Sequence, residues 1–132
     1  MKIFTLLFIF IFTTYLQAQI VLVTNKKSDI NHLTKESIKY LYLAKVSKIA
    51  GIKIKPLRTN NMILHKEFIN EIIDKDIHQY RSYWARLVFT GRKAIPQRLN
   101  KEEIRQALKE LNTIMYINKK DMNTNWKIIY EK

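Results

Sequence analysis

The sequence contains no cysteine, and only two glycines and two prolines occur among its 132 residues. Without cysteine the chain can form no disulfide, can offer no thiolate to a metal and cannot carry a lipid on an N-terminal cysteine. It also lacks a glycine-rich phosphate-binding loop, a serine in a nucleophile elbow and histidines at metal-ligand spacing. We therefore expect a protein that is not an enzyme, with no catalytic residues, no cofactor and no bound metal.

Acidic residues are scarce as well. The chain has 11 Asp and Glu against 24 Lys and Arg, which gives a formal net charge of +13. A basic domain can bind nucleic acid by neutralising phosphates, but here the charge is mostly lysine, spread along the chain without an arginine stripe or a basic tail. We interpret it as a solvated lysine-rich surface and expect no nucleic-acid partner. Attraction to anionic ligands or to an anionic envelope surface is the alternative.

Residues 1–18 have the layout of a secretory signal peptide. Lys2 is followed by an apolar run over 3–15, and Ala18 provides the small residue of a cleavage site. As a helix this run spans roughly 20 Å, short of the roughly 30 Å hydrocarbon core of a bilayer. We expect export to the periplasm with cleavage near Ala18, which leaves residues 19–132 as one domain. Because no charge occurs between Lys2 and Lys26, an uncleaved membrane anchor is the alternative.

The apolar pattern of the remaining chain alternates between strand and helix periods. Thr34 and the pair Asn100 and Glu103 occupy N-terminal capping positions, and Gly91 stands where a left-handed residue ends a helix. The pattern predicts strands over 20–24, 52–57, 113–117 and 126–130, and helices over 33–43, 60–75, 77–90 and 101–112. This order indicates a single α/β domain with helices on a mostly buried sheet.

Residues 83–99, YWARLVFTGRKAIPQRL, combine aromatic and basic side chains. Helical spacing places four of them on one side, as is typical of a core-facing helix: Tyr83, Trp84, Leu87 and Val88. Stacking of the aromatic rings on nucleic-acid bases is the alternative. The same spacing rule places Ile63 and Leu111 on buried faces. Beyond Gly91, we expect Arg92 and Lys93 in an exposed loop, as a candidate secondary contact for a ligand or a partner.

Residues 58–61, RTNN, are the candidate ligand-binding residues. They lie between an expected strand and the start of an expected helix, where free backbone N–H groups and the helix dipole favour an anion. Arg58 can supply a bidentate fork, and Thr59, Asn60 and Asn61 add polar groups. The alternative is structural: Asn60 or Asn61 is an ordinary N-cap, and Arg58 is a surface residue.

Several segments resemble one protein family. YWARLVFTGRKAIPQRL is similar to the family segment YWARLIFTGKG.PP, HKEFINEII (65–73) to the helix REAFY..VL, and EEIRQALKELNTIMYIN (102–118) to EEV...V...PGAIGYV. The family is that of the phosphate ABC transporter substrate-binding proteins, of the type II periplasmic-binding-protein class. The chain most resembles its small, single-lobe exported members.

The resemblance implies a three-layer-like α/β domain, whose mixed, mostly parallel sheet is flanked by helices as in one lobe of these proteins. It also implies a periplasmic protein that binds phosphate or another small oxyanion. In the family an Arg and a Ser-Gly-Ser-Gly-Thr loop wrap the oxyanion; here Arg58 is in place, and Thr59, Asn60 and Asn61 replace the loop. This departure favours the alternative of a ligand-free protein-interaction module of the cell envelope, with a transporter or a sensor protein as its partner.

Overall fold

The computed structural model describes residues 19–132 and contains a mixed four-stranded sheet. Its order is β4–β7–β1–β8, formed by β1 (Ile20–Asn25), β4 (Lys55–Pro56), β7 (Thr113–Asn118) and β8 (Trp126–Glu131). β4 runs parallel to β7, but β1 is antiparallel to both β7 and β8. The expected mixed sheet is confirmed, whereas the expectation that it is mostly parallel is wrong. The continuous apolar run of β1 indicates burial on both faces and carries no information on strand direction.

Two short strand pairs complete the β structure. β2 (Lys48–Ile49) and β3 (Ile52–Lys53) form an antiparallel pair, and β5 (Arg58–Thr59) runs parallel to β6 (Arg98–Leu99). The single strand expected over 52–57 is therefore broken. The Ile54 N–H donates to the Ser47 carbonyl while the Lys55 N–H donates to that of Asn112, because the chain changes its partner strand at this point.

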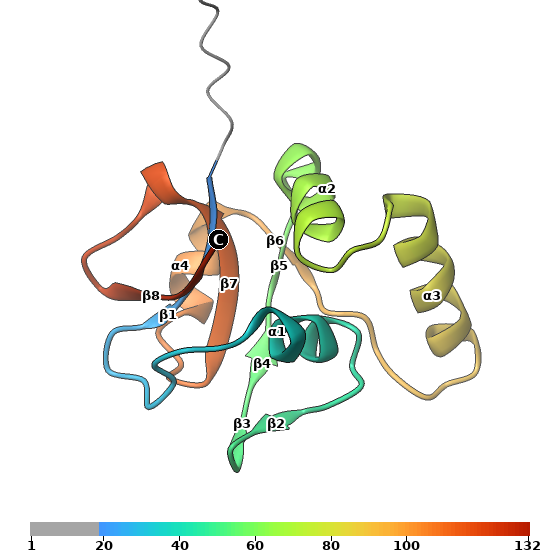
Figure 1. Ribbon diagram of the computed structural model, residues 1–132, viewed down its shortest axis with the longest axis horizontal. Coiled ribbons are helices and arrows are strands. Elements are labelled where there is room, and N and C mark those ends of the chain that lie inside the picture. Colours follow the sequence, from blue (N-terminus) through green and yellow to red (C-terminus); the bar gives the residue numbers. More distant parts are fainter. Residues whose placement is uncertain (1–18) are drawn as a thin grey trace, which may run out of the picture.

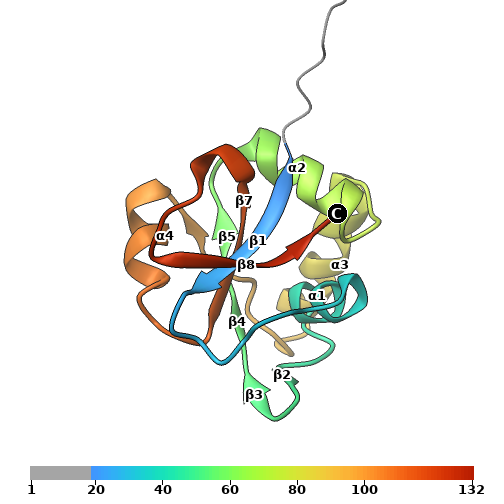
Figure 2. The same ribbon diagram turned by 60° about the vertical axis from the view of Figure 1, so that its left-hand side comes forward.

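Helices cover both sides of the sheet. They are α1 (Lys35–Tyr42), α2 (Met62–Glu71), α3 (Ile77–Phe89) and α4 (Lys101–Ala107), and a short 3₁₀ helix, η1 (Lys119–Asp121), follows β7. Three strands of the sheet, β1, β7 and β8, lie to the left of α1, α2 and α3 in Figure 1. Figure 2 shows α4 on the left of the sheet and α1 and α3 on the right. The expected domain, a sheet flanked by helices, is confirmed.

The predicted capping residues are confirmed, whereas the helices expected over 60–75 and 101–112 end earlier, at Glu71 and Ala107. The Ser37 N–H donates to the Thr34 hydroxyl at the start of α1, and Asn100 and Glu103 form a capping box at the start of α4. Gly91, just beyond α3, has a φ of +68°, which glycine adopts without the steric penalty of a side chain.

The core lies between the sheet and the helices. The strands β1 and β7 are buried over most of their length, and the helices add large side chains: Ile38, Tyr42, Phe68, Ile69, Tyr80, Trp84 and Ile104. Three residues expected in the core are instead exposed: Ile63, Val88 and Leu111. Ile63 lies in the first turn of α2, Val88 lies in the last turn of α3, and Leu111 follows the end of α4, so each lies beyond the part of its helix that packs on the core.

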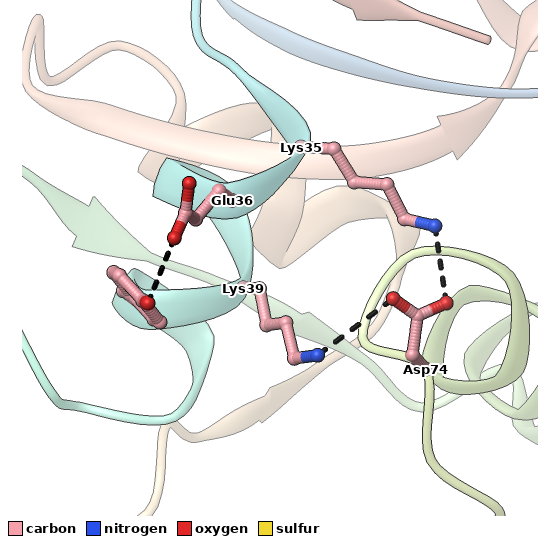
Figure 3. Close-up of polar contacts among 5 residues, drawn as sticks. Lys35, Glu36, Lys39 and Asp74 are labelled. Atoms are coloured by element: carbon pink, nitrogen blue, oxygen red, sulfur yellow. Dashed lines mark hydrogen bonds and ion pairs between the residues drawn. The ribbon is translucent and has the colours of Figure 1, made fainter.

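Two lysines of α1 bind the junction between α2 and α3 (Figure 3). Lys35 Nζ lies 3.0 Å from one carboxylate oxygen of Asp74, and Lys39 Nζ lies 3.7 Å from the other. The hydrogen bond from Lys35 holds the pKa of Asp74 below its ordinary value. Asp74 has a φ of +59° and turns the chain from α2 into α3. Because these side chains are partly exposed, each pair contributes at most about 1 kcal/mol.

The N-terminal segment is not part of this description. The expected signal peptide, residues 1–18, and its cleavage near Ala18 lie outside the described residues. Within residues 19–132, no helix combines the length and the apolar character that crossing a bilayer requires.

Candidate functional site

The structure separates the four residues that the sequence singles out. Arg58 lines a cavity of about 280 Å³ beside α3. Thr59, Asn60 and Asn61 line a different cavity of about 580 Å³, together with Met115 of β7. Successive residues of a strand point to opposite faces, so the side chains of Arg58 and Thr59 diverge. β5 ends at Thr59, so Asn60 and Asn61 lie beyond the strand. The four residues therefore do not form one binding loop.

The backbone N–H groups of this segment already have acceptors within the protein. The Thr59 N–H donates to the Tyr116 hydroxyl at 3.2 Å, and the Asn60 N–H donates to the Leu99 carbonyl at 2.9 Å. The Asn61 N–H donates to Thr59 Oγ1, and the Asn61 side chain accepts the Leu64 N–H as the N-cap of α2. The capping interpretation of Asn61 is confirmed, and these N–H groups are not free to hold an anion.

The cavity beside Arg58 is strongly basic. Its charged and polar lining consists of Arg58 of β5, His65 of α2, Tyr80, Arg81 and Trp84 of α3, and Arg98 of β6. We call it the arginine pocket. No carboxylate lines it among residues 19–132. Arg58 and Arg98 are register partners in the parallel pair β5–β6, where like charges repel unless another group intervenes.

Three buried donors in the wall of the arginine pocket have no hydrogen-bond partner within residues 19–132: Arg58 Nε, the Tyr80 hydroxyl and Trp84 Nε1. The three side chains are 7%, 1% and 2% exposed. The Tyr80 hydroxyl and the Trp84 N–H lie close enough to influence each other, but their geometry falls short of a hydrogen bond. Each unpartnered buried donor costs about 1–3 kcal/mol, and because the three atoms are covered by protein, an acceptor in the pocket reaches them only when neighbouring side chains move.

The charge of Arg58 is also uncompensated. None of the three arginines forms an ion pair with any residue in the described part of the chain, where the ion pairs involve other side chains. Burial lowers the pKa of Arg58, and the neighbouring charge of Arg98 lowers it further, but a guanidinium stays protonated at neutral pH. Of its guanidinium nitrogens only Nε is enclosed, so the charge faces the pocket without a counter-charge from residues 19–132. The arrangement therefore favours the entry of an anion.

A hydrogen-bonded pair behind the pocket holds Arg58 in place. The Tyr116 hydroxyl lies 2.6 Å from His65 Nδ1 and accepts the N–H of Thr59, the residue after Arg58. Burial lowers the pKa of His65 to about 4, and the charges of Arg58, Arg98 and Arg81 contribute to this effect. Burial raises the pKa of Tyr116. At neutral pH both groups are therefore uncharged, and because the Tyr116 oxygen already accepts the Thr59 N–H, we infer that its O–H donates to Nδ1 and that the imidazole proton is on Nε2.

Replacing Tyr116 by Phe tests this pair. The Tyr116→Phe variant keeps the ring, which stacks on Phe68 at 3.8 Å between centroids. It leaves the Thr59 N–H without an acceptor and His65 Nδ1 without a donor, so we expect the free energy of unfolding to fall by about 2–4 kcal/mol in urea denaturation. The control is Tyr40→Phe, whose hydroxyl binds only the exposed Glu36, with an expected change below about 0.5 kcal/mol. Equal effects of the two substitutions would contradict the role of Tyr116.

The sequence interpretation finds Arg58 but misses the residues around it. His65, Tyr80, Arg81, Trp84 and Arg98 reach the pocket from three different elements, α2, α3 and β6. One sequence signal could have indicated part of this set: Tyr80, Arg81 and Trp84 have the spacing of residues on one face of a helix.

The predicted secondary contact lies elsewhere. Arg92 and Lys93 are exposed in the loop after α3, and neither lines the arginine pocket. The Arg92 N–H donates to the Leu87 carbonyl, which closes the end of α3. The role of these two residues in contacting a ligand or a partner stays a prediction.

Comparison with known proteins supports the fold. No family model and no curated protein matches the sequence. The structure is similar to a crystal structure described as a phosphate ABC transporter substrate-binding protein with bound phosphate, from Clostridium perfringens, with a TM-score of 0.62 and 17% identity. The match covers 84% of this chain and 44% of that one, so this chain spans less than half of that protein's length. At this identity the likeness concerns the fold alone: the α/β fold of this chain is similar to part of that protein.

Proposed function

We propose that the protein is an exported, periplasmic solute-binding-like domain that binds a small oxyanion, such as phosphate, in the arginine pocket. The observation that carries the proposal is the buried guanidinium of Arg58, which has Arg98 as its register partner and no counter-charge within residues 19–132. An oxyanion would separate the two like charges and neutralise them. The Clostridium protein with bound phosphate supports the choice of ligand.

The chemistry of the pocket suits binding rather than catalysis. Guanidinium groups bind oxyanions through paired N–H donors, and Trp84 and Tyr80 add one donor each. In this proposal none of these groups acts as a nucleophile or a general base at neutral pH. We propose a non-enzymatic protein that needs no cofactor and no metal, since its own side chains supply the positive charge.

Titration calorimetry with phosphate and with sulfate tests the proposal. We expect heat of binding for at least one of them with protein produced from the full-length sequence. The Arg98→Ala variant is expected to weaken binding at least about tenfold, because a charge-assisted contact contributes roughly 1.5–3 kcal/mol. The control is Arg86→Ala, which removes an equal charge from α3 outside the pocket and is expected to change affinity less than twofold. No heat at millimolar concentration of either ion would refute the proposal.

A second candidate function is an envelope interaction module that has lost its ligand. One observation favours it: Phe89, at the end of α3, is 93% exposed. A large exposed apolar side chain is common at protein interfaces. The partner would be a transporter or a sensor protein. This function would be favoured over the first if the protein bound such a partner, if Phe89→Ser weakened that binding, and if titration with phosphate and sulfate gave no heat.

A further inference from the structure

The arginine pocket is larger and more apolar than a bare oxyanion requires. Its volume is about 280 Å³, several times the roughly 30 Å³ that a water molecule occupies in the liquid. Besides its basic side chains it is lined by Ile77, Ala85, Val88 and Ile95. Cavities that hold small organic molecules start at about 300 Å³ and combine an apolar lining with a few placed polar groups. At about 280 Å³ the arginine pocket lies just below this range, and it has a lining of this kind.

The apolar lining follows one face of α3. Ile77, Arg81, Ala85 and Val88 are spaced by four, four and three residues, so they lie in a row along the helix. Ala85 and Val88 are exposed in the free protein, although Val88 has the spacing of a core residue. In this row Arg81 lies near the middle of the helix, and Ala85 and Val88 lie towards its C-terminal end. A ligand that is anionic at one end and apolar at the other would match it.

The charge of the pocket favours a doubly charged head group. Three guanidinium groups line the pocket, and no carboxylate within residues 19–132 does so. Three unpartnered donors belong to side chains of this wall, and a head group with several acceptor oxygens suits them better than one with a single oxygen. Phosphoryl groups attached to carbon or to an ester oxygen carry about −1.5 to −2 charges near pH 7 and have three acceptor oxygens.

We propose that the arginine pocket prefers a phosphonate or a phosphate monoester with a small apolar substituent over bare phosphate. The head group binds Arg58, Arg98, Tyr80 and Trp84, and the substituent lies along Ala85 and Val88. This inference rests on the proposed function, because it assumes that the pocket binds oxyanions. It goes further by assigning a purpose to the apolar half of the cavity.

Competition between phosphate and phenylphosphonate, measured by titration calorimetry at pH 8, tests the preference. We expect phenylphosphonate to bind at least about tenfold more tightly, because the pocket removes the apolar ring from water. The Ala85→Leu variant fills the apolar half and is expected to reduce the preference to less than about twofold. Val88→Ser, at an already exposed site, is a second variant and should lower phenylphosphonate affinity in the same direction. Ser82→Leu, exposed on α3 outside the pocket, is the matched control and should keep the full preference.

The outcomes separate the two proposals. If phosphate binds as tightly as phenylphosphonate, the preference is refuted while oxyanion binding stands. If neither compound binds, the proposed function fails as well. A preference that Ala85→Leu and Val88→Ser both leave intact would overturn the assignment of the substituent to this half of the cavity.

Discussion

The Arg58→Met variant is expected to lose oxyanion binding and, at the same time, to make the ligand-free protein more stable. Arg58 is 7% exposed and has no counter-charge within residues 19–132. Methionine has a similar length and no charge, so it removes a buried cation and the repulsion from Arg98. Replacing buried charges by apolar side chains is often neutral or stabilising by about 1–4 kcal/mol. We expect the free energy of unfolding to rise by about 1–2 kcal/mol, and Tm by roughly 4–8 °C.

The affinity of this variant provides the second half of the test. Removing one partner of a buried charge pair costs about 2–5 kcal/mol, so we expect oxyanion affinity to fall at least about 30-fold by calorimetry. Arg86→Met is the control, because it removes an exposed arginine of α3 from outside the pocket. It should change neither Tm nor affinity appreciably. A destabilised Arg58→Met protein would mean that Arg58 serves the fold, and the anion site would have to be abandoned.

Stability is expected to fall by about 2 kcal/mol when the pH is lowered from 7 to 5. A histidine of the unfolded chain binds a proton near pH 6.5, whereas folded His65 does so only near pH 4. Between these values the unfolded state binds more protons, so stability decreases as the pH falls through this window. Each unit of pKa difference corresponds to about 1.4 kcal/mol. Asp74, whose pKa is lowered by Lys35, loses its contribution only below the ordinary carboxylate range.

Urea denaturation at several pH values measures this effect. His65→Gln keeps an acceptor for the Tyr116 hydroxyl but has no titrating ring, so its stability should change little between pH 7 and 5. His78→Gln, exposed on α3, should retain the fall seen in the wild-type protein. The imidazole signal of His65 in NMR gives the pKa directly. An equal fall in His65→Gln would assign the pH dependence to other groups.

Local sequence signals predicted the capping residues of the helices well. The caps at Thr34 and Asn100 and the left-handed Gly91 depend on residues within a few positions of one another. Such interactions leave a readable pattern in the chain. The buried runs of β1 and β7 were equally clear, because burial on both faces produces consecutive apolar residues.

The candidate site was predicted only in part, because it depends on a long-range strand pair. Arg58 and Arg98 are 40 positions apart and become neighbours through two strands of two residues each. Strands so short carry no alternating pattern that could reveal their partner. The sequence also placed the anion at the N–H groups of residues 59–61, which the structure shows to be engaged by Tyr116, Leu99 and Thr59.

The elements that form the arginine pocket pack on one hydrophobic core, and this affects how fast a ligand could exchange. β5, β6, α2 and α3 supply the basic lining of the pocket, and buried residues of all four belong to the same core or lie directly on it. Among the described residues, the side chains at the pocket mouth that would have to move for the proposed ligand to enter are exposed ones such as Arg81 and Arg98, whose rotations occur in picoseconds to nanoseconds. An ion would be captured and released rapidly, as in a reversible buffer, with the positive surface of the domain drawing it in from solution.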